Sequence, residues 1–577
     1  MRKLLSALVW GATPALAWAC CFGVLTESLA AQDELPLGAA TSTKGMVASV
    51  HPLATDAGVA ALRRGGNAVD AAIAVGLTLG VVDGKNSGLG GGGFILIRRA
   101  DGQLVAIDGR ETAPAKATRD MYLRDGRPQP ELSQLGPLAV GTPGLLAAYE
   151  LALREHGRLS LQDLILPAAQ IAETGFPLDR SNADAQRSAG RMLAKVNGGR
   201  CSLLKEDGSP FQEGDIVKQP DLAATYRAIG QHGPDWFYRG PLAEKVGRWM
   251  AENGGILAAS DFAAYRPIVR EPLATTYRGR TIVGFPPPSS GGVHVAQILN
   301  ILEPFDVRAI HERDPGEYHH LLAEAMKLAL ADRAYWLGDP DHARVPRGLV
   351  DKEYARQLAA KINLAQATPV AGHGTPPAAD ERVFEKHTTH IAAADAVGNW
   401  VAITQTINTT YGSKVIVPGT GVVLNNEMDD FAIAPGTPNA FGLVGAEANA
   451  VAPGKRPLSS MSPTIVLEDG QPVMTVGAAG GPTIITQSLQ AIVRRFDLGL
   501  PPPEAIGQPR IHHQWSPDEV RIESRLPAAH KQSLTSRGHK LREIKSMGVS
   551  QAIFFDPTTR VLIGVHDPRV PGKAAGP

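Results

Sequence analysis

The sequence predicts a mixed α/β protein that folds as one unit. Segments 55–64, 68–82, 293–302 and 318–338 have apolar or amphipathic helical periodicity, and they alternate with strand-like runs such as 94–98. A length of 577 residues would allow roughly four domains of about 150 residues each. The chain has no internal repeat, and its one obvious linker precedes Thr388. We therefore expect a single intertwined globular unit.

The N-terminus has the pattern of a secretory signal. Arg2 and Lys3 precede an apolar stretch, 4–25, and small residues up to Ala30 and Ala31 lead into a polar run. We expect residues 1–30 to be a signal peptide and the protein to be periplasmic or secreted. The stretch is also long enough to serve as an uncleaved membrane anchor. Because Cys20 and Cys21 lie inside it, Cys201 is left alone and no intramolecular disulfide is expected.

Two motifs that suggest other chemistries are incomplete. The glycines of 89–94 look like a phosphate loop, but the Lys-Ser/Thr ending is absent and a strand-like run follows. Ser202-Leu-Leu-Lys205 fits the S-x-x-K pattern of β-lactamases without the S-D-N or K-T-G companions. We therefore expect neither phosphate binding at 89–94 nor β-lactamase-type chemistry at 202–205.

Histidine pairs and overall charge also argue against metal and nucleic-acid sites. His319-His320 and His512-His513 are interpreted as lacking the i, i+4 spacing and acidic companions of a zinc site, which favours structural or surface roles. Lysine plus arginine and aspartate plus glutamate number 57 each, so there is no basic footprint for nucleic acid. We expect a soluble enzyme that needs no metal and no organic cofactor.

A predicted hairpin holds the most reactive side chains. Segments 388–394 and 400–407 are rich in Thr, Val, Ile and Ala, and the turn-like 395–399 joins them. If Ala394 faces Trp400, Thr388 falls opposite Thr406 at a Cβ separation of about 4.5–5.5 Å. Two hydroxyls at that distance can hydrogen-bond, although Thr–Thr pairs are also common in ordinary sheets.

The chain before this hairpin is suited to being cut. Segment 366–380 is a Pro/Gly/Ala tract that does not hold regular structure, and it ends shortly before Thr388. Cleavage at His387–Thr388 would give Thr388 a free α-amine with a pKa of roughly 7.7–8.0, a usable base near neutral pH. An N-terminal threonine then carries both nucleophile and base.

With these residues in view, the chain resembles the γ-glutamyltranspeptidase family of N-terminal nucleophile hydrolases. The matching motifs run in family order over nearly the whole mature chain. They are 65–72, 89–94, 108–116, 286–292, Thr388-Thr389-His390, 406–412, 424–431, 457–463 and Gly480-Gly481.

The resemblance implies a four-layer αββα sandwich and a precursor that cuts itself at His387–Thr388. Residues 31–387 would form a large subunit and residues 388–577 a small catalytic subunit intertwined with it. The Thr388 hydroxyl would form a γ-glutamyl ester, oriented by Thr406, and water or an amino-acid or peptide acceptor would take the glutamyl group. Implied substrates are small γ-glutamyl compounds such as glutathione.

The resemblance also assigns the substrate-binding residues. Gly480 and Gly481 would supply the backbone N–H groups of an oxyanion hole, next to Ala478-Ala479 where many relatives have Ser-Pro. The remaining assignments place Arg110, Ser459 and Ser460 on the substrate α-carboxylate and Asn408, Glu427 and Asp430 on its α-ammonium.

Segment 435–451 resembles the lid loop that covers the glutamyl pocket in part of the family. Phe441 stands where some relatives carry a tyrosine, so the hydrogen bond that such a hydroxyl could make is lost.

Two alternatives remain beside the γ-glutamyl function. One is an acylase on the same scaffold that removes a glutaryl side chain, for instance from a β-lactam nucleus; its substrate lacks the α-ammonium that Glu427 and Asp430 would bind. The other is a non-catalytic, self-cleaved envelope protein, which would not need the complete set of Thr388, Thr406, Arg110 and Gly480-Gly481.

Overall fold

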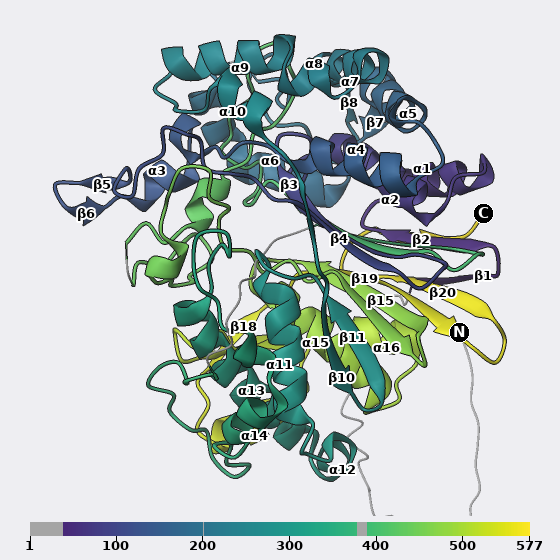
Figure 1. The fold of residues 1–577 in the computed structure, drawn as a ribbon, viewed down its shortest axis with the longest axis vertical. Coiled ribbons are helices and arrows are strands. Elements are labelled where there is room, and N and C mark those ends of the chain that lie inside the picture. Colours follow the sequence, from purple (N-terminus) through teal and green to yellow (C-terminus); the bar gives the residue numbers. More distant parts are fainter. Residues whose placement is uncertain (1–37, 200, 378–388, 435) are drawn as a thin grey trace, which may run out of the picture. The chain divides into compact units, whose positions relative to one another are not determined.

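The computed structural model describes residues 38–199, 201–377, 389–434 and 436–577. Two seven-stranded sheets stack face to face in this part of the chain, and helices cover the outer face of each sheet (Figure 1). The predicted four-layer αββα sandwich is thereby confirmed.

The first sheet is antiparallel throughout and carries the hairpin of interest at its centre. In spatial order its strands are β21 (Lys573–Ala575), β2 (Gly45–Ser49), β12 (His390–Asp395), β13 (Trp400–Thr406), β3 (Gly92–Arg98), β4 (Leu104–Gly109) and β9 (Ile268–Arg270). The glycine-rich 89–94 therefore runs into strand β3, as predicted.

The second sheet is also antiparallel and faces the first. Its order is β1 (Gly38–Ser42), β20 (Val561–His566), β19 (Val549–Asp556), β15 (Gln471–Ala479), β14 (Thr464–Glu468), β11 (Arg280–Gly284) and β10 (Leu273–Tyr277). Both sheets mix strands from before and after the 378–388 gap, so neither segment forms a sheet of the sandwich by itself.

The central strands are buried on both faces, which explains their continuous apolar sequences. In β3, Ile95 and Ile97 belong to the core under the helices, whereas Phe94 and Leu96 belong to the core between the sheets. The ring of Phe94 stacks on Phe285 across the sandwich, with centroids 4.2 Å apart. The core between the two sheets is thus apolar at these positions of β3.

One helical layer covers the first sheet. Its helix α2 is completely buried, and Asn67 begins it with a capping box in which Asp70 accepts the Asn67 N–H at 2.7 Å. The helices and short strands on this side are α1 (Pro52–Arg63), α2 (Ala68–Val82), β5 (Leu123–Arg124), β6 (Arg127–Pro128), α3 (Pro130–Gln134), α4 (Leu145–His156), α5 (Leu161–Thr174), β7 (Phe176–Pro177), α6 (Arg180–Val196), β8 (Ile216–Val217), α7 (Pro220–His232), α8 (Asp235–Tyr238), α9 (Pro241–Glu252) and α10 (Ala259–Ala264).

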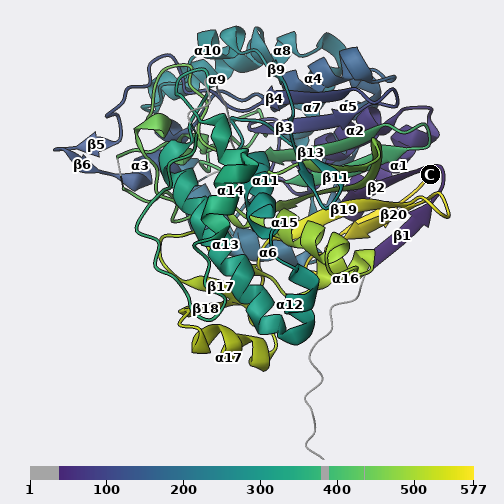
Figure 2. The ribbon, with the colours of Figure 1, turned by 60° about the horizontal axis from the view of Figure 1, so that its bottom comes forward.

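A second helical layer covers the other sheet, with α11 and α15 packed directly on it (Figure 2). Its elements are α11 (Ser290–Leu302), α12 (Val307–Arg313), α13 (Pro315–Trp336), α14 (Lys352–Ala359), α15 (Thr483–Phe496), α16 (Pro502–Gly507), β16 (Ile511–His512), β17 (Val520–Glu523), α17 (Ala528–Ser536) and β18 (Leu541–Ile544). Helix α13 begins three residues before the predicted 318 because Asp314 caps it and Pro315 occupies its first turn.

The four histidines for which a structural or surface role was predicted lie inside the protein. His319, His320, His512 and His513 are all buried, in agreement with a structural role. The expectation that they lack acidic companions at i, i+4 is wrong for His320, because Glu324 lies one helical turn further along α13 and is buried beside it.

Two sets of predictions lie outside the described residues. These are the signal segment 1–30 and the cleavage bond His387–Thr388, including Thr388 itself. Among the described residues, no helix combines the length and apolar character needed to cross a membrane.

Candidate active site

The hairpin has the register that the sequence predicts. Ala394 pairs with Trp400 and His390 with Thr404, and the Gln405 N–H donates to the Thr389 carbonyl at 2.6 Å. Antiparallel pairing thus continues to the residue that follows Thr388. Strand β12 lies between β2 and β13, and it pairs with β13 from His390 onward and with β2 from Ala392 onward.

Thr406 lies at the end of β13 and is buried. Its hydroxyl oxygen accepts the N–H of Asn408 at 2.7 Å. A hydroxyl that accepts through one lone pair keeps its own proton for donation to another acceptor. Thr406 is therefore able to donate a hydrogen bond.

His390 is packed so tightly that its position is fixed. A Cβ on Gly477 of the facing strand β15 would lie 2.3 Å from its Nδ1, so only glycine fits there. The same nitrogen lies 3.1 Å from the Thr404 hydroxyl, and burial lowers the pKa of His390 to about 3. The ring is neutral at physiological pH and wedges the hairpin against the second sheet.

Arg110 joins three carboxylates in the interior. Its guanidinium contacts Glu427, donates to Asp430 at 2.8 Å and lies 3.4 Å from Glu111. All four side chains are buried. The sequence separation of Arg110 from Glu427 is 317 residues, so only the fold brings these two side chains together.

Burial and mutual repulsion perturb the acidic members of this cluster. Burial raises the pKa of Glu111 to about 7, against the opposing effect of Arg110. The pKa of Glu427 is also raised, by burial first and by the neighbouring carboxylates second. One oxygen of each of these glutamates finds no hydrogen-bond partner among the described residues.

The backbone of Arg110 is anchored from outside the cluster. Its carbonyl accepts the Tyr265 hydroxyl at 2.7 Å and the Arg456 guanidinium at 3.1 Å, while its Nε donates to the Pro457 carbonyl at 3.2 Å. Arg456 in turn pairs with Asp108 at 3.0 Å. These contacts fix Arg110 relative to strand β4 and to the loop before β14.

The residues predicted for the substrate ammonium lie together. Glu427 and Asp430 belong to a short 3₁₀ helix, η3 (Glu427–Asp430). Asn408 has a positive φ of 74° and donates from its side chain to the Asn426 carbonyl, next to that helix, at 2.9 Å. Its side-chain oxygen has no hydrogen-bond partner among the described residues, so it is available to a donor.

Ser459 and Ser460 lie beside a second arginine. The Ser460 hydroxyl accepts from Arg333 at 3.4 Å, and Arg333 also donates to Ser290 at 3.1 Å. Ser290 donates to the Ser459 carbonyl at 2.5 Å, so the first turn of α11 fixes the serine pair. Arg333 and Asp430 line one small cavity of about 10 Å³.

Gly480 and Gly481 form the turn between strand β15 and helix α15. Their φ angles of +131° and +60° are ones that residues with a Cβ rarely adopt. No hydrogen bond from the N–H of either glycine to another described residue is present. Ala478 and Ala479 belong to the paired part of β15, so the departure from Ser-Pro occurs in a strand.

The segment predicted as a lid reaches the glycine turn. The Phe441 ring lies so close to Gly481 that a Cβ there would be 2.8 Å from the ring. Asn439 donates to Asp430 at 3.2 Å, and the Ala440 N–H donates to Asp429 at 2.9 Å. The loop therefore spans from the acidic 3₁₀ helix to the glycine turn, and the space beneath it is no larger than about one water molecule.

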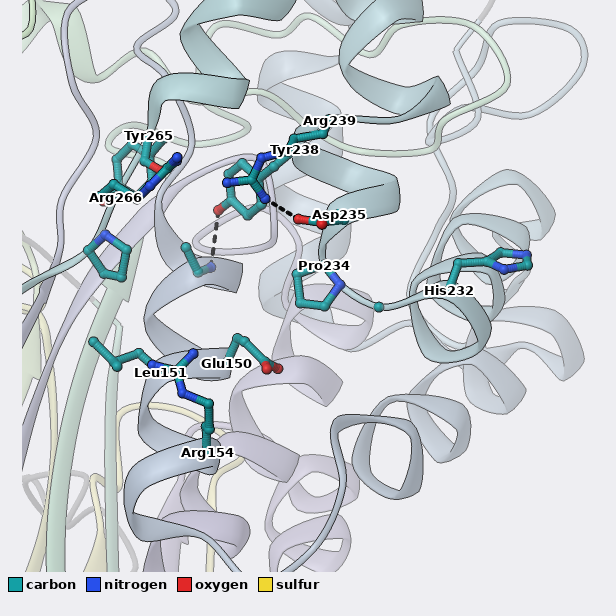
Figure 3. A pocket seen from close by; sticks show the side chains of 13 residues that line it. Glu150, Leu151, Arg154, His232, Pro234, Asp235, Tyr238, Arg239, Tyr265 and Arg266 are labelled. Atoms are coloured by element: carbon teal, nitrogen blue, oxygen red, sulfur yellow. Dashed lines mark hydrogen bonds and ion pairs between the residues drawn. The ribbon is translucent and has the colours of Figure 1, made fainter.

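A separate cleft of about 560 Å³ lies between α4, α7 and α8 (Figure 3). Arg154, Arg239 and Arg266 project around it, and Asp235 pairs with Arg239. None of the predicted site residues lines it. Tyr265 links it to the site, because its hydroxyl donates to the Arg110 carbonyl.

Sequence reasoning missed Glu111, Tyr265 and Arg333. Glu111 lies next to Arg110 in motif 108–116, and the sequence did not indicate that its side chain is buried. Tyr265 and Arg333 come from unrelated segments, so only the fold brings them to the site.

The chain is similar to known proteins over most of its length. The γ-glutamyltranspeptidase family model matches residues 54–577. The chain is 44% identical over 528 residues to a glutathione hydrolase proenzyme of Escherichia coli, covering 91% of this chain and 90% of that protein. It is 39% identical to the acylase ACY 1 proenzyme of a Pseudomonas species, covering 90% and 91%.

The fold has solved counterparts as well. A cephalosporin acylase from Bacillus halodurans superimposes with a TM-score of 0.83 at 30% identity, covering 93% of this chain and 96% of that one. The match of the family model over most of the chain and the identity to full-length relatives lead to one conclusion: the chain belongs to the γ-glutamyltranspeptidase family.

Proposed function

We propose that this protein is a self-cleaving γ-glutamyltransferase and glutathione hydrolase. The observation that carries the proposal is the buried cluster of one guanidinium and three carboxylates around Arg110. Even with Arg333 at the edge of the same region, the carboxylates outnumber the cations. A ligand that brings an ammonium and a carboxylate on one carbon would satisfy both kinds of group.

The substrate would enter by rearranging these contacts. Its α-carboxylate would take the Arg110 guanidinium, together with the hydroxyls of Ser459 and Ser460. Its α-ammonium would lie between Asn408, Glu427 and Asp430, where it would lower the raised pKa of Glu427 by supplying the missing positive charge. The lid segment would have to move away, because the cavity beneath it, about 10 Å³, is too small for a glutamyl group.

Chemistry would start from Thr388. In the precursor its hydroxyl attacks the His387 carbonyl, and the His387–Thr388 amide bond breaks in an N-to-O acyl shift that frees the α-amine. Water then hydrolyses the resulting ester, which releases the His387 carboxylate and restores the Thr388 hydroxyl. In the mature enzyme that amine takes the hydroxyl proton as the oxygen attacks the γ-amide of the substrate. The proton passes to the leaving amine, and a glutamyl ester remains on Thr388 until water or an acceptor amine removes it.

The neighbours of Thr388 have matching roles in this proposal. Thr406 donates a hydrogen bond to the nucleophilic oxygen, for which its proton is available. The N–H groups of Gly480 and Gly481 bind the oxyanion, because they project without bound acceptors among the described residues. An N-terminal signal, removed near Ala30 or Ala31, would export the precursor.

The decisive experiment compares Thr388→Ala with Thr388→Ser. The alanine variant is expected to run as one uncut polypeptide without turnover, whereas the serine variant keeps a hydroxyl and should yield two bands. Edman sequencing of the smaller wild-type band should read Thr-Thr-His. Two bands from Thr388→Ala would refute self-cleavage at this residue.

A second candidate activity is supported by the acylases among the relatives. A glutaryl amide has no α-ammonium to place beside Glu427 and Asp430, so it should be a poorer substrate than glutathione or glutamine. Parallel assays of the three compounds, with and without a dipeptide acceptor, distinguish the two activities. A preference for the glutaryl amide would favour the acylase.

A further inference from the structure

A second cluster of chemically capable side chains lies far from the hairpin, between α13 and the loop that joins α17 to β18 (Figure 2). His320 and Glu324 lie one turn apart on α13, and His539 approaches from that loop. All three are buried. His320 Nδ1 lies 2.7 Å from His539 Nε2, which is 4.0 Å from Glu324 Oε1.

The surroundings of this cluster orient its lone pairs inward. The Asn363 carbonyl lies 2.8 Å from His320 Nε2 and can only accept, so that nitrogen carries the proton and Nδ1 holds a lone pair. The Thr368 N–H donates to Glu324 Oε2 at 2.9 Å, which leaves Oε1 for another partner. Such outer contacts are typical of residues that hold a metal ion.

Lys327 currently supplies the positive charge at this site. Its ammonium lies 2.7 Å from Glu324 Oε1 and 3.9 Å from Asp518, whose side chain is 62% exposed. A cavity of about 100 Å³ borders Lys327, Thr368, Asp518 and His539. The ammonium therefore has both a second carboxylate and the space to move to it.

We propose that His320 Nδ1, Glu324 Oε1 and His539 Nε2 bind one divalent transition-metal ion of the zinc class. Two imidazole nitrogens and a carboxylate oxygen are a common zinc ligand set, and water from the adjacent cavity completes a tetrahedron. The ligand atoms all lie within 4.8 Å of one another, and a separation between the two imidazoles larger than the present 2.7 Å would accommodate the ion. Lys327 moves to Asp518 as the ion enters.

The position of this site gives it a structural consequence, which rests on the proposed self-cleavage. His320 and Glu324 precede Thr388 in the chain, whereas His539 follows it. A bound ion would link the two subunits far from the catalytic hairpin. The ion should accordingly raise the melting temperature of the cut enzyme.

The test is titration of the purified, chelator-treated full-length protein with Zn²⁺ by calorimetry, and with Co²⁺ to detect a tetrahedral absorption spectrum. Wild type should bind one ion per chain. His539→Gln and Glu324→Gln should each lose more than the roughly 10–100-fold in affinity that is typical of outer contacts. His530→Gln, which alters a histidine that packs on His319 instead, serves as the matched control and should bind normally.

Lys327→Met gives the sharpest discrimination. Removing the competing ammonium should tighten zinc binding at least about tenfold, because wild type must first break a buried ion pair. Thermal melting checks that each variant is folded.

Two results would overturn the proposal: no saturable binding by either wild type or Lys327→Met, or binding that survives both His539→Gln and Glu324→Gln. The uncut Thr388→Ala precursor has the same ligands, so it should bind zinc as well. Zinc titration therefore tests the metal site, and cleavage and turnover assays test the proposed catalytic function, so either proposal can fail without the other.

Discussion

Arg110 is the single side chain on which the predicted glutamyl site depends most. It contacts Glu111, Glu427 and Asp430 at once, and its backbone is fixed by Tyr265. A planar guanidinium can serve several carboxylates in this way, whereas a lysine ammonium is a point charge on a flexible stem. Replacement of Arg110 by lysine keeps the positive charge but removes the planar arrangement of donors that reaches several carboxylates.

Arg110→Lys is therefore expected to mature normally but to lose catalytic efficiency. One lost hydrogen bond to a charged group costs about 1.5–3 kcal/mol, which is roughly a tenfold to 150-fold fall in kcat/KM for glutathione. Steady-state kinetics and a denaturing gel measure the two effects. Arg187→Lys, at an exposed ion pair with Asp184, is the control and should match wild type. Unchanged kcat/KM in Arg110→Lys would remove Arg110 from the site.

Glu111 leads to a prediction about pH. Its pKa is raised to about 7 by burial, so the folded protein keeps this proton up to about pH 7 while the unfolded chain releases it near the ordinary value of 4.5. Between these values the folded state binds more protons, and its stability falls as pH rises. The Glu111→Gln variant has no carboxyl to titrate at this position, so it should not lose this part of its stability as pH rises.

The melting temperature of wild type should accordingly decline relative to that of Glu111→Gln from about pH 4.5 to about pH 7 and run parallel above it. Differential scanning calorimetry of both proteins across that range measures the difference. If the melting temperatures of the two proteins changed in parallel over the whole range, the raised pKa of Glu111 would be contradicted.

At the scale of elements, the turn between β15 and α15 meets the lid segment. Gly481 has a φ of +60° and no room for a Cβ, since the Phe441 ring would be 2.8 Å away. Two separate costs follow for any larger residue. One is the left-handed backbone, about 1–2 kcal/mol, and the other is the clash with the ring.

Gly481→Ala should lower kcat by on the order of a hundredfold, the typical effect of a disturbed oxyanion hole. The double variant Phe441→Ala, Gly481→Ala should recover part of this loss, because the clash disappears and only the backbone strain remains. Stopped-flow measurement of acylation gives both values, with Phe441→Ala alone as the control. A double variant as slow as Gly481→Ala would exclude the ring as the cause.

The sequence predicted local elements well where one periodicity dominated. The register Ala394 to Trp400 followed from strand residues on both sides of a five-residue loop, and α2 followed from a largely apolar run. Contacts between distant segments carry no such local signal. The pairing of Arg110 with Glu427 could be anticipated only from family resemblance, and that of His320 with His539 not at all, because 219 residues separate them.

At the scale of the whole molecule, each sheet draws strands from both sides of the predicted cut. In the first sheet, β2, β3, β4 and β9 precede the 378–388 gap, whereas β12, β13 and β21 follow it (Figure 1). The backbone hydrogen bonds between β2 and β12 and between β13 and β3 would thus become contacts between subunits. The shared interior between the sheets is formed by both segments as well.

The two subunits of the cleaved protein should therefore stay together in native buffer and separate only when the fold is lost. Size-exclusion chromatography is expected to give one peak with both chains. In a guanidinium titration, loss of tertiary fluorescence and separation of the chains should share one midpoint. Free small subunit at denaturant concentrations that leave the fold intact would contradict this arrangement.

Strand β12, held between β2 and β13, has a consequence for the timing of activation. The carbonyl of Thr389 already accepts the Gln405 N–H, so the segment that follows the nucleophile is aligned by the sheet. Cleavage then produces the new N-terminus at Thr388, and the strands around it need no further rearrangement. Turnover would appear in step with bond breakage and show no lag phase, since the zymogen has assembled the scaffold of the enzyme in advance.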